Sequence, residues 1–217
     1  MKTVIFDMDG LLVDSEVRAL RAWREVAKRR GIEGIDDLFP KMIGMNPYTR
    51  GLLFAELYGE DFPFTECDEE VRSVAHGYEA ENPVPLKKGA RELLAYFREN
   101  GYRIAIASSG LLATIERRMK YHGILDYFDV IVSGDMVTKS KPNPEIFLLC
   151  AAKLGVPPSE ITVLEDSQNG IRAAHAAGMR PVMVPDFVAP EKEVAALAYA
   201  VCSSLFEVKE KYENGSL

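Results

Sequence analysis

The stretch Val4-Ile5-Phe6-Asp7-Met8-Asp9-Gly10 decides the fold of this chain and points to its chemistry. A short apolar run, typical of a buried strand, leads directly into two carboxylates one residue apart and then a glycine. Carboxylates at the end of a buried strand cost free energy unless a cation meets them. The stretch therefore predicts a cleft where Asp7 and Asp9 serve a metal, or where one attacks an electrophile while the other moves protons.

Beyond residue 84, apolar strands alternate with amphipathic helices. We expect strands at 103–107, 130–132, 161–164 and 181–184, helices at 89–99, 111–122, 144–154 and 169–177, and a short helix in the tail after 207. In the third of these helices, Asn143 is the expected cap, Pro144 the first residue and Gly155 the stop. This alternation predicts an α/β fold, a doubly wound (Rossmann-like) parallel sheet covered on both faces.

The interval between the first two strands is different, because it is helical throughout and broken by turns. Asp14-Ser15-Glu16 supplies capping residues, and apolar residues then recur at helical spacing up to Gly31. Asn82-Pro83-Val84-Pro85 is typical of an extended linker. We therefore expect a core formed by 1–14 and 84–217, with an inserted helical cap at 15–83.

Composition narrows the classes of function. The chain has 217 residues, 47% of them hydrophobic, which supports a substantial core, and its net charge of −7 argues against a nucleic-acid-binding surface. Its three cysteines form no metal-binding pattern and are expected to be reduced thiols. No apolar run approaches membrane-spanning length, and the first strand leaves no room for a signal peptide. We expect a cytoplasmic protein without a membrane or nucleic-acid partner, and a monomer because no apolar stripe is left over.

The expected strand ends supply further polar side chains. In open parallel sheets, ligands bind outside the carboxyl ends of the strands, so residues that follow different strands meet in one crevice. The candidates that follow the four strands in turn are Asp7 and Asp9, Ser108 and Ser109, Lys141, and Glu165 and Asp166. Two acidic pairs, hydroxyls and a lysine are chemically complementary, which is difficult to attribute to chance.

The charges of these groups suggest their roles. Converging carboxylates repel one another unless a hard cation joins them, and Mg²⁺ is the usual partner of carboxylates and phosphate. The Ser108 hydroxyl and the Lys141 charge are suited to binding a phosphate. Asp7 could then attack phosphorus to form an acyl-phosphate, while Asp9 protonates the leaving alcohol and later activates water.

In this order and spacing, Asp7-Met8-Asp9-Gly10, Ser108, Lys141 and Glu165-Asp166 resemble the four motifs of the haloacid dehalogenase superfamily. The resemblance covers nearly the whole chain, with an insertion where the helical cap of subclass I members sits. The longer stretches at 140–147 and 164–171 are similar to the branch that contains β-phosphoglucomutase and sugar-phosphate phosphatases. The resemblance implies Asp7 as nucleophile, Asp9 as acid/base, and Ser108 and Lys141 as phosphate ligands. It also implies magnesium held by Asp7, the Asp9 backbone carbonyl and Asp166, with Glu165 close by.

Within this family, the residues favour one reaction. An acid at Asp9 is absent from the family's dehalogenases, so carbon–halogen cleavage is excluded. The related mutases carry a histidine where this chain has Ala19, and an arginine soon after the cap glycine, where this chain reads Gly44-Met45-Asn46-Pro47-Tyr48. We therefore expect a phosphatase that acts on a small sugar, polyol or nucleoside phosphate, with a sugar-phosphate mutase as the alternative. A non-catalytic phosphate-binding protein is disfavoured because every catalytic carboxylate is present.

Some assignments have simpler competitors. Glu165-Asp166 could merely cap the helix that begins near Asn169, Ser109 could be a turn residue, and Lys139 competes with Lys141. The cap offers Glu16, Asn46 and Arg50 as candidate substrate ligands, with Arg18, His76 and Tyr78 behind them.

Overall fold

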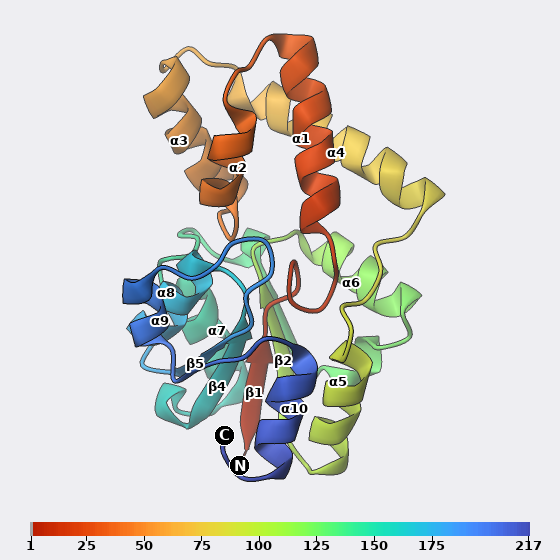
Figure 1. Cartoon of the computed structure of the whole chain (residues 1–217), viewed down its shortest axis with the longest axis vertical. Coiled ribbons are helices and arrows are strands. Elements are labelled where there is room, and N and C mark those ends of the chain that lie inside the picture. The colour runs from red at the N-terminus through yellow and green to blue at the C-terminus, as the bar shows by residue number, and fades with distance from the viewer. Residues whose placement is uncertain (1) are drawn as a thin grey trace.

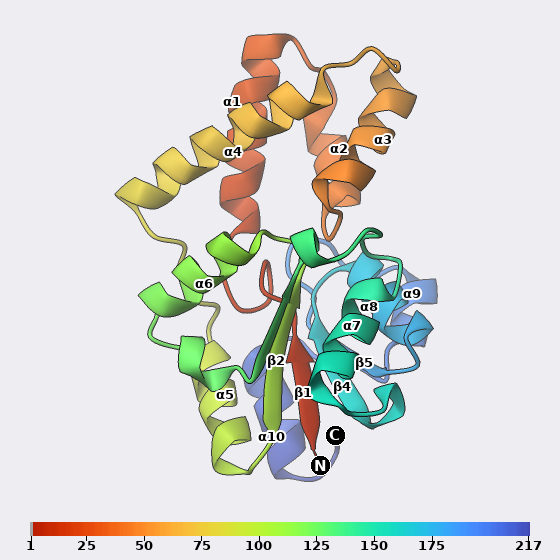
Figure 2. The same ribbon diagram turned by 180° about the vertical axis from the view of Figure 1, so that it is seen from behind.

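The computed structural model describes residues 2–217 as a six-stranded parallel sheet with helices on both faces and a helical insertion beyond its carboxyl edge (Figures 1 and 2). The strand order is β3-β2-β1-β4-β5-β6, so β1 lies in the interior of the sheet between β2 and β4. The strands are β1 (Thr3–Phe6), β2 (Arg103–Ser108), β3 (Val130–Ser133), β4 (Ile161–Glu165), β5 (Arg180–Met183) and β6 (Ala200–Val201).

Ten α-helices in the described part of the chain connect and flank these strands. They are α1 (Glu16–Arg30), α2 (Ile35–Met42), α3 (Pro47–Tyr58), α4 (Phe64–Glu81), α5 (Ala90–Glu99), α6 (Leu112–Tyr121), α7 (Glu145–Leu154), α8 (Gln168–Ala176), α9 (Lys192–Leu197) and α10 (Leu205–Glu213). Short 3₁₀ turns occupy Leu125–Tyr127, Gly134–Met136 and Pro158–Glu160.

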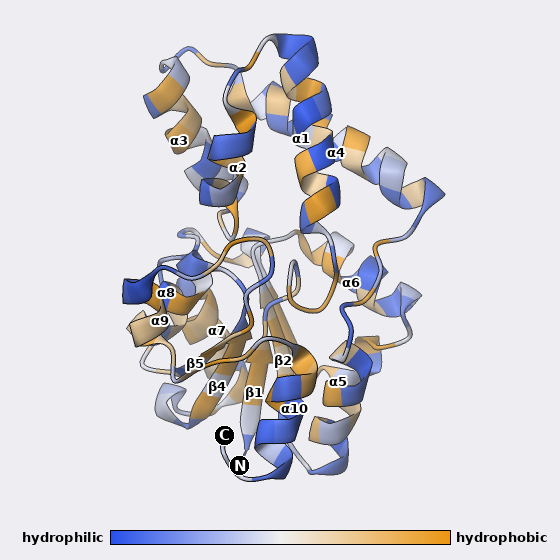
Figure 3. Ribbon diagram, in the orientation of Figure 1, coloured by the Kyte–Doolittle hydropathy of each residue, from blue (hydrophilic) through white to orange (hydrophobic). Residues whose placement is uncertain are grey.

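Alternate residues of β1 belong to the apolar clusters on opposite faces of the sheet. Val4 and Phe6 pack against α5, α6 and α10, whereas Ile5 packs against α7 and α8. Every residue of β1 is buried, as expected of a strand covered on both faces. Figure 3 shows the sheet as largely hydrophobic, with hydrophilic residues on the outward sides of the flanking helices. The predicted doubly wound α/β fold is confirmed.

The helices α1 to α4 enclose an apolar cluster of their own. Trp23 stacks on Phe54 with ring centroids 5.3 Å apart, and Phe54 also contacts Phe62 and Phe64. In both ribbon views these four helices lie beyond the carboxyl edge of the sheet, and the chain passes between them and the core at two points (Figures 1 and 2). Their buried aromatic rings give this bundle an apolar centre separate from the sheet.

Local details differ from the sequence-based expectations. Helix α7 begins at Glu145 with Pro144 as its N-cap, while Asn143 accepts a hydrogen bond from the Glu145 N–H. Gly155 ends this helix in the left-handed conformation, as predicted. Helix α9 and strand β6 were not predicted, because both are short and β6 pairs only two residues with β5. None of the helices in residues 2–217 combines the length and apolarity needed to cross a lipid bilayer.

Candidate active site

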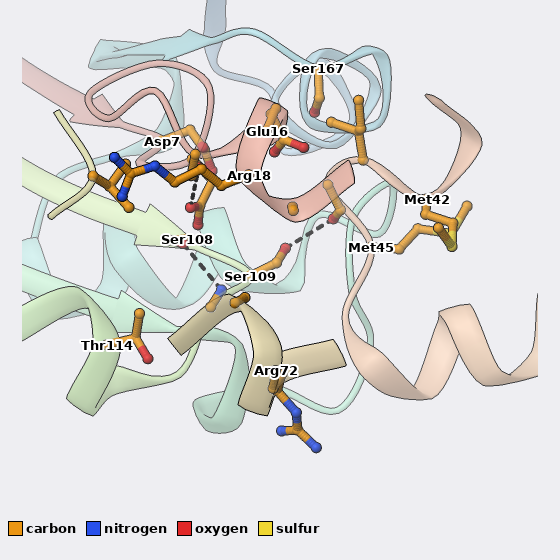
Figure 4. A pocket seen from close by; sticks show the side chains of 18 of the residues that line it. Asp7, Glu16, Arg18, Met42, Met45, Arg72, Ser108, Ser109, Thr114 and Ser167 are labelled. Carbon is orange, nitrogen blue, oxygen red and sulfur yellow. Dashed lines mark hydrogen bonds between the residues drawn. The ribbon is translucent and has the colours of Figure 1, made fainter. Parts of the chain in front are cut away.

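The carboxyl ends of β1, β2 and β4 and the nearby cap helices surround one cavity of about 260 Å³. The strand order changes direction around β1, which is where ligands bind in open α/β sheets. Figure 4 shows Asp7 and Ser108 from the core and Glu16 from α1 around this cavity. The cavity brings together the following predicted residues: Asp7, Asp9, Ser108, Ser109, Glu165, Asp166, Glu16 and Arg50.

Three buried carboxylates form the floor of the site. Asp7 follows β1, Glu165 ends β4 and Asp166 follows it, and one oxygen of each lies within 4.8 Å of the others. Burial, and next the neighbouring Glu165, raise the pKa of Asp7 to about 8. Burial, followed by Glu165 and Asp7, also raises the pKa of Asp166 well above its usual value. The three carboxyl groups therefore ionise together only where a cation offsets their charge.

Lys141 is the buried cation of this cluster. Its Nζ lies 2.6 Å from Asp7 Oδ1 and 2.7 Å from Glu165 Oε2, and it donates to the Ala107 carbonyl at 3.2 Å. Burial alone would lower the pKa of this ammonium, but Asp7 and Glu165 outweigh burial and raise it. Lys139, the sequence competitor, is exposed. The geometry therefore selects Lys141, which meets two of the three carboxylates.

Two glycines make room for the acids. A Cβ on Gly170 would stand 1.9 Å from the Glu165 side chain, and a Cβ on Gly10 would stand 2.3 Å from Asp166 Oδ2. Gly10 also has a positive φ of 81°. Ser167 caps α8 by accepting from the Gly170 N–H, so Glu165 and Asp166 are not the caps of that helix. Glu165 instead accepts hydrogen bonds from Ser167 and pairs with Lys141.

The two serines after β2 have different surroundings. Ser108 is buried, and its Oγ accepts a hydrogen bond from the Gly110 N–H at the start of the following loop. The Ser109 hydroxyl donates to the Gly44 carbonyl of the α2–α3 loop at 2.9 Å (Figure 4). Ser108 therefore faces the cavity from the core, whereas Ser109 joins the core to the cap.

Asp9 lies beside the cluster and is less buried. Its Oδ1 accepts hydrogen bonds from Ser15 Oγ and from Arg118 Nη1, each at 2.6 Å. Ser15 precedes α1 and was expected to cap it, but its side chain makes no capping hydrogen bond. The serine instead positions the Asp9 carboxylate.

The three cap candidates have different positions. Glu16 is buried at the cavity, and burial, then Asp9 and Asp7, raise its pKa to about 8. Arg50 lines the cavity and pairs with Asp68 at 2.7 Å, while its Nε has no hydrogen-bond partner among residues 2–217. Asn46 does not line the cavity, because its side chain caps α3 by accepting from the Thr49 N–H. Asn46 therefore has a structural role in this geometry.

Sequence reasoning missed Arg118 and Glu79, which both line the cavity. Arg118 lies on α6 and Glu79 in the last turn of α4, so neither follows a strand. The sequence signal that could have singled out Arg118 is its place beside Met119 and three residues after Ile115, the two buried residues of α6. The charged residues Arg117 and Lys120 next to it made the segment resemble an exposed face. The cavity also includes Arg18, Arg72 and His76, whereas Tyr78 contacts Glu25 on the cap surface.

The doubly wound fold and the carboxylates at its strand ends define a class of α/β protein with an acidic site. Comparison with known proteins identifies the family. Residues 1–178 match the family model described as a haloacid dehalogenase-like hydrolase, and the chain belongs to this family. It is 35% identical to hexitol phosphatase B of Escherichia coli K12 over 212 residues, which cover 95% of this chain and 94% of that protein. It is also 35% identical to a phosphorylated carbohydrates phosphatase of Thermotoga maritima, with 84% of each covered.

Solved structures agree with this assignment. The chain aligns with CbbY from Rhodobacter sphaeroides in complex with phosphate at a TM-score of 0.81, 28% identity and 96% coverage of each chain. It aligns with a putative β-phosphoglucomutase of Thermotoga maritima at a TM-score of 0.75, 29% identity and 99% coverage of each. The resemblance to the sugar-phosphate branch of the family, inferred from the motifs, is confirmed.

Proposed function

We propose that this protein is a Mg²⁺-dependent phosphatase that hydrolyses a small sugar or polyol phosphomonoester through an aspartyl-phosphate at Asp7. The carrying observation is the buried cluster of Asp7, Glu165 and Asp166 with a single lysine among them. Relatives named as phosphatases of hexitols and of phosphorylated carbohydrates support the substrate class. The cavity volume, about 260 Å³, lies below the roughly 300–1,000 Å³ of pockets for drug-sized ligands and suits a small molecule.

The donor set fits magnesium. When all three buried carboxylates are ionised, one ammonium leaves an excess of two negative charges, and hard oxygen ligands are those that Mg²⁺ prefers. Asp7, the Asp9 backbone carbonyl and Asp166 would hold the ion, with Glu165 behind them. Glu165 already pairs with Lys141 and Ser167, which supports a role in fixing the site around the ion. When bound, Mg²⁺ supplies positive charge that offsets the phosphoryl oxygens.

In the reaction, a carboxylate oxygen of Asp7 attacks phosphorus, and the bond from phosphorus to the alcohol oxygen breaks. Asp9 gives its proton to the departing alcohol, and then takes a proton from the water that attacks the aspartyl-phosphate. Asp7 is regenerated as inorganic phosphate leaves. Lys141 and Ser108 bind phosphoryl oxygens, and Ser109 is a further donor once its bond to Gly44 is released.

We propose that the functional division follows the sequence, with a core at 1–14 and 84–217 and a cap at 15–83. The cap contributes Glu16 and Arg50 to the cavity, where a carboxyl group and a guanidinium can hydrogen-bond sugar hydroxyls. The Nε of Arg50, which has no hydrogen-bond partner in the described part of the chain, also keeps a mutase as the second candidate, because a guanidinium can hold a second phosphate.

Phosphate release from a panel of sugar and polyol phosphates, with and without MgCl₂, tests the proposal. We expect Mg²⁺-dependent turnover of at least one polyol or sugar phosphate, abolished in Asp7→Asn. Conversion of β-glucose 1-phosphate to the 6-phosphate, dependent on a bisphosphate primer and releasing little phosphate, would instead establish the mutase. Undiminished turnover after metal removal would refute the metal role.

A further inference from the structure

Arg118 joins three separate parts of the chain through one guanidinium group. It projects from α6 of the core, and its Nη1 donates to Asp9 Oδ1 at 2.6 Å. Its Nε and Nη2 lie 3.0 and 3.4 Å from the two carboxylate oxygens of Glu79, which belongs to the last turn of α4. The planar fork of an arginine fixes the directions of all three bonds at once.

The bridge is largely removed from water. The Arg118 side chain is 14% exposed and that of Glu79 is 6% exposed. Burial alone would lower the pKa of Arg118, but Asp9 and Glu79 outweigh burial and raise it. A buried charge pair that meets its partners with good geometry orients its members firmly, and removing one partner leaves the other uncompensated.

The bridge contacts only one of the two oxygens of the Asp9 carboxylate. Oδ1 accepts hydrogen bonds from Ser15 and Arg118, whereas Oδ2 lies on the side of the loop that begins at Ser108. A Cβ on Gly110 would stand 3.7 Å from Asp9 Oδ2 and 3.3 Å from Ser108 Oγ. The oxygen without a hydrogen-bond partner among residues 2–217 is thus the one directed toward the expected phosphate position.

We infer that Arg118 is a positioning residue that holds Asp9 Oδ2 toward the leaving group, and that Glu79 anchors Arg118 for this purpose from the cap. This inference rests on the proposed function, in which Asp9 is the acid/base. A salt bridge of this kind links the orientation of the acid/base to the position of α4, because Glu79 belongs to that helix of the proposed cap.

Leaving-group dependence tests this role. An alkyl phosphate needs a proton on its departing alcohol, whereas p-nitrophenolate leaves as an anion. We expect Arg118→Met to lower kcat/KM for the best sugar or polyol phosphate by roughly 10-fold or more, within the roughly 10²–10⁴-fold that general acid–base catalysis supplies. The loss for p-nitrophenyl phosphate should stay within about threefold, and Asp9→Asn should show the same selectivity more strongly.

The structure offers a matched control. Arg117 is the neighbour of Arg118 on α6 and also pairs with Glu79, at 3.0 Å, but it does not contact Asp9. Arg117→Met should leave the ratio of the two substrates unchanged. Glu79→Met should reproduce part of the Arg118→Met selectivity, and the double variant should be no worse than Arg118→Met alone, since the two residues act in series.

Three results would overturn the positioning role while leaving the phosphatase proposal intact. These are equal losses on both substrates in Arg118→Met, the same substrate selectivity in Arg117→Met, and additive effects of the Arg118 and Glu79 changes. Wild-type protein that cleaves neither substrate would refute the proposed function, and the positioning role with it. Thermal unfolding of each variant separates these results from a loss of folded protein.

Discussion

Lys141→Met removes the cation that stands between two buried carboxylates, and its effect on stability follows from the geometry. Lys141 lies within 2.7 Å of both Asp7 and Glu165 and is 1% exposed. Breaking a buried ion pair by removing one partner costs about 3–5 kcal/mol, because the remaining charge is uncompensated. Methionine is unbranched and only one heavy atom shorter than lysine, so the loss reflects charge more than volume.

The size of this loss should depend on pH. Without Lys141 the pKa of Asp7, already about 8, rises further, because the ammonium no longer offsets burial and the neighbouring Glu165. An acid whose pKa is higher in the folded state than in the unfolded state loses stability as pH rises toward its folded value. In metal-free buffer, both folded proteins keep Asp7 protonated well below pH 8, so the loss should grow above that value, from about 1–2 kcal/mol at pH 7 to about 3–5 kcal/mol at pH 9.5.

Urea unfolding followed by circular dichroism, in EDTA at the two pH values, measures this difference. Lys139→Met is the control, since Lys139 is exposed two residues away and should change stability by less than about 0.5 kcal/mol. A Lys141→Met loss equal to that of the control, or one that does not grow with pH, would refute the charge argument. With Mg²⁺ and substrate, Lys141→Met should also lower kcat by roughly 10²–10³-fold, as loss of a preorganised phosphoryl donor does.

Three further predictions follow from the site. Mg²⁺ at 100 times its Kd should stabilise the folded protein by about 2.7 kcal/mol. The shift in Tm that Mg²⁺ causes should be larger at pH 8 than at pH 6, because the raised pKa values of Asp7 and Asp166 make protons compete with the ion. An equal shift at both pH values would contradict this competition. Gly170→Ala should cost about 1–3 kcal/mol and weaken Mg²⁺ binding, measured by calorimetry, because its Cβ would displace Glu165; unchanged binding would contradict the packing. As pH rises from 6 to 9, the free energy of unfolding of Glu16→Gln should increase by at least about 1 kcal/mol relative to that of wild type, measured in urea. The reason is that the Glu16 carboxyl, with a pKa of about 8, must ionise while buried in wild type. No such increase would place Glu16 in a more solvated setting.

The sequence predicted the parts of the site that follow strands, for a simple physical reason. Parallel strands place their carboxyl ends at one edge, so Asp7, Ser108 and Glu165 could be brought together from strand order alone. Periodicity likewise located the main helices and strands of the core. These predictions needed no knowledge of side-chain packing.

Strand order and periodicity could not predict the side-chain contacts between different helices. Arg118 and Glu79 meet only because α4 of the cap approaches α6 of the core, a geometry that no local pattern encodes. Ser15 is a second contact that local patterns did not predict. Its position before a helix predicted a capping role, whereas its hydroxyl donates a hydrogen bond to Asp9. Asn46 was expected at the substrate, and its capping of α3 is the local role that its residue type favours.

Trapping the phosphorylated enzyme tests the central claim most directly. The protein is mixed with Mg²⁺ and its best phosphomonoester, quenched in acid within the first turnover, digested and analysed by mass spectrometry. The account predicts one added phosphoryl group on the peptide that contains Asp7, lost on mild alkaline treatment and absent from Asp7→Asn. Rapid phosphate release with no phosphorylated peptide, or a phosphoryl group on another residue, would contradict the role of Asp7 as nucleophile.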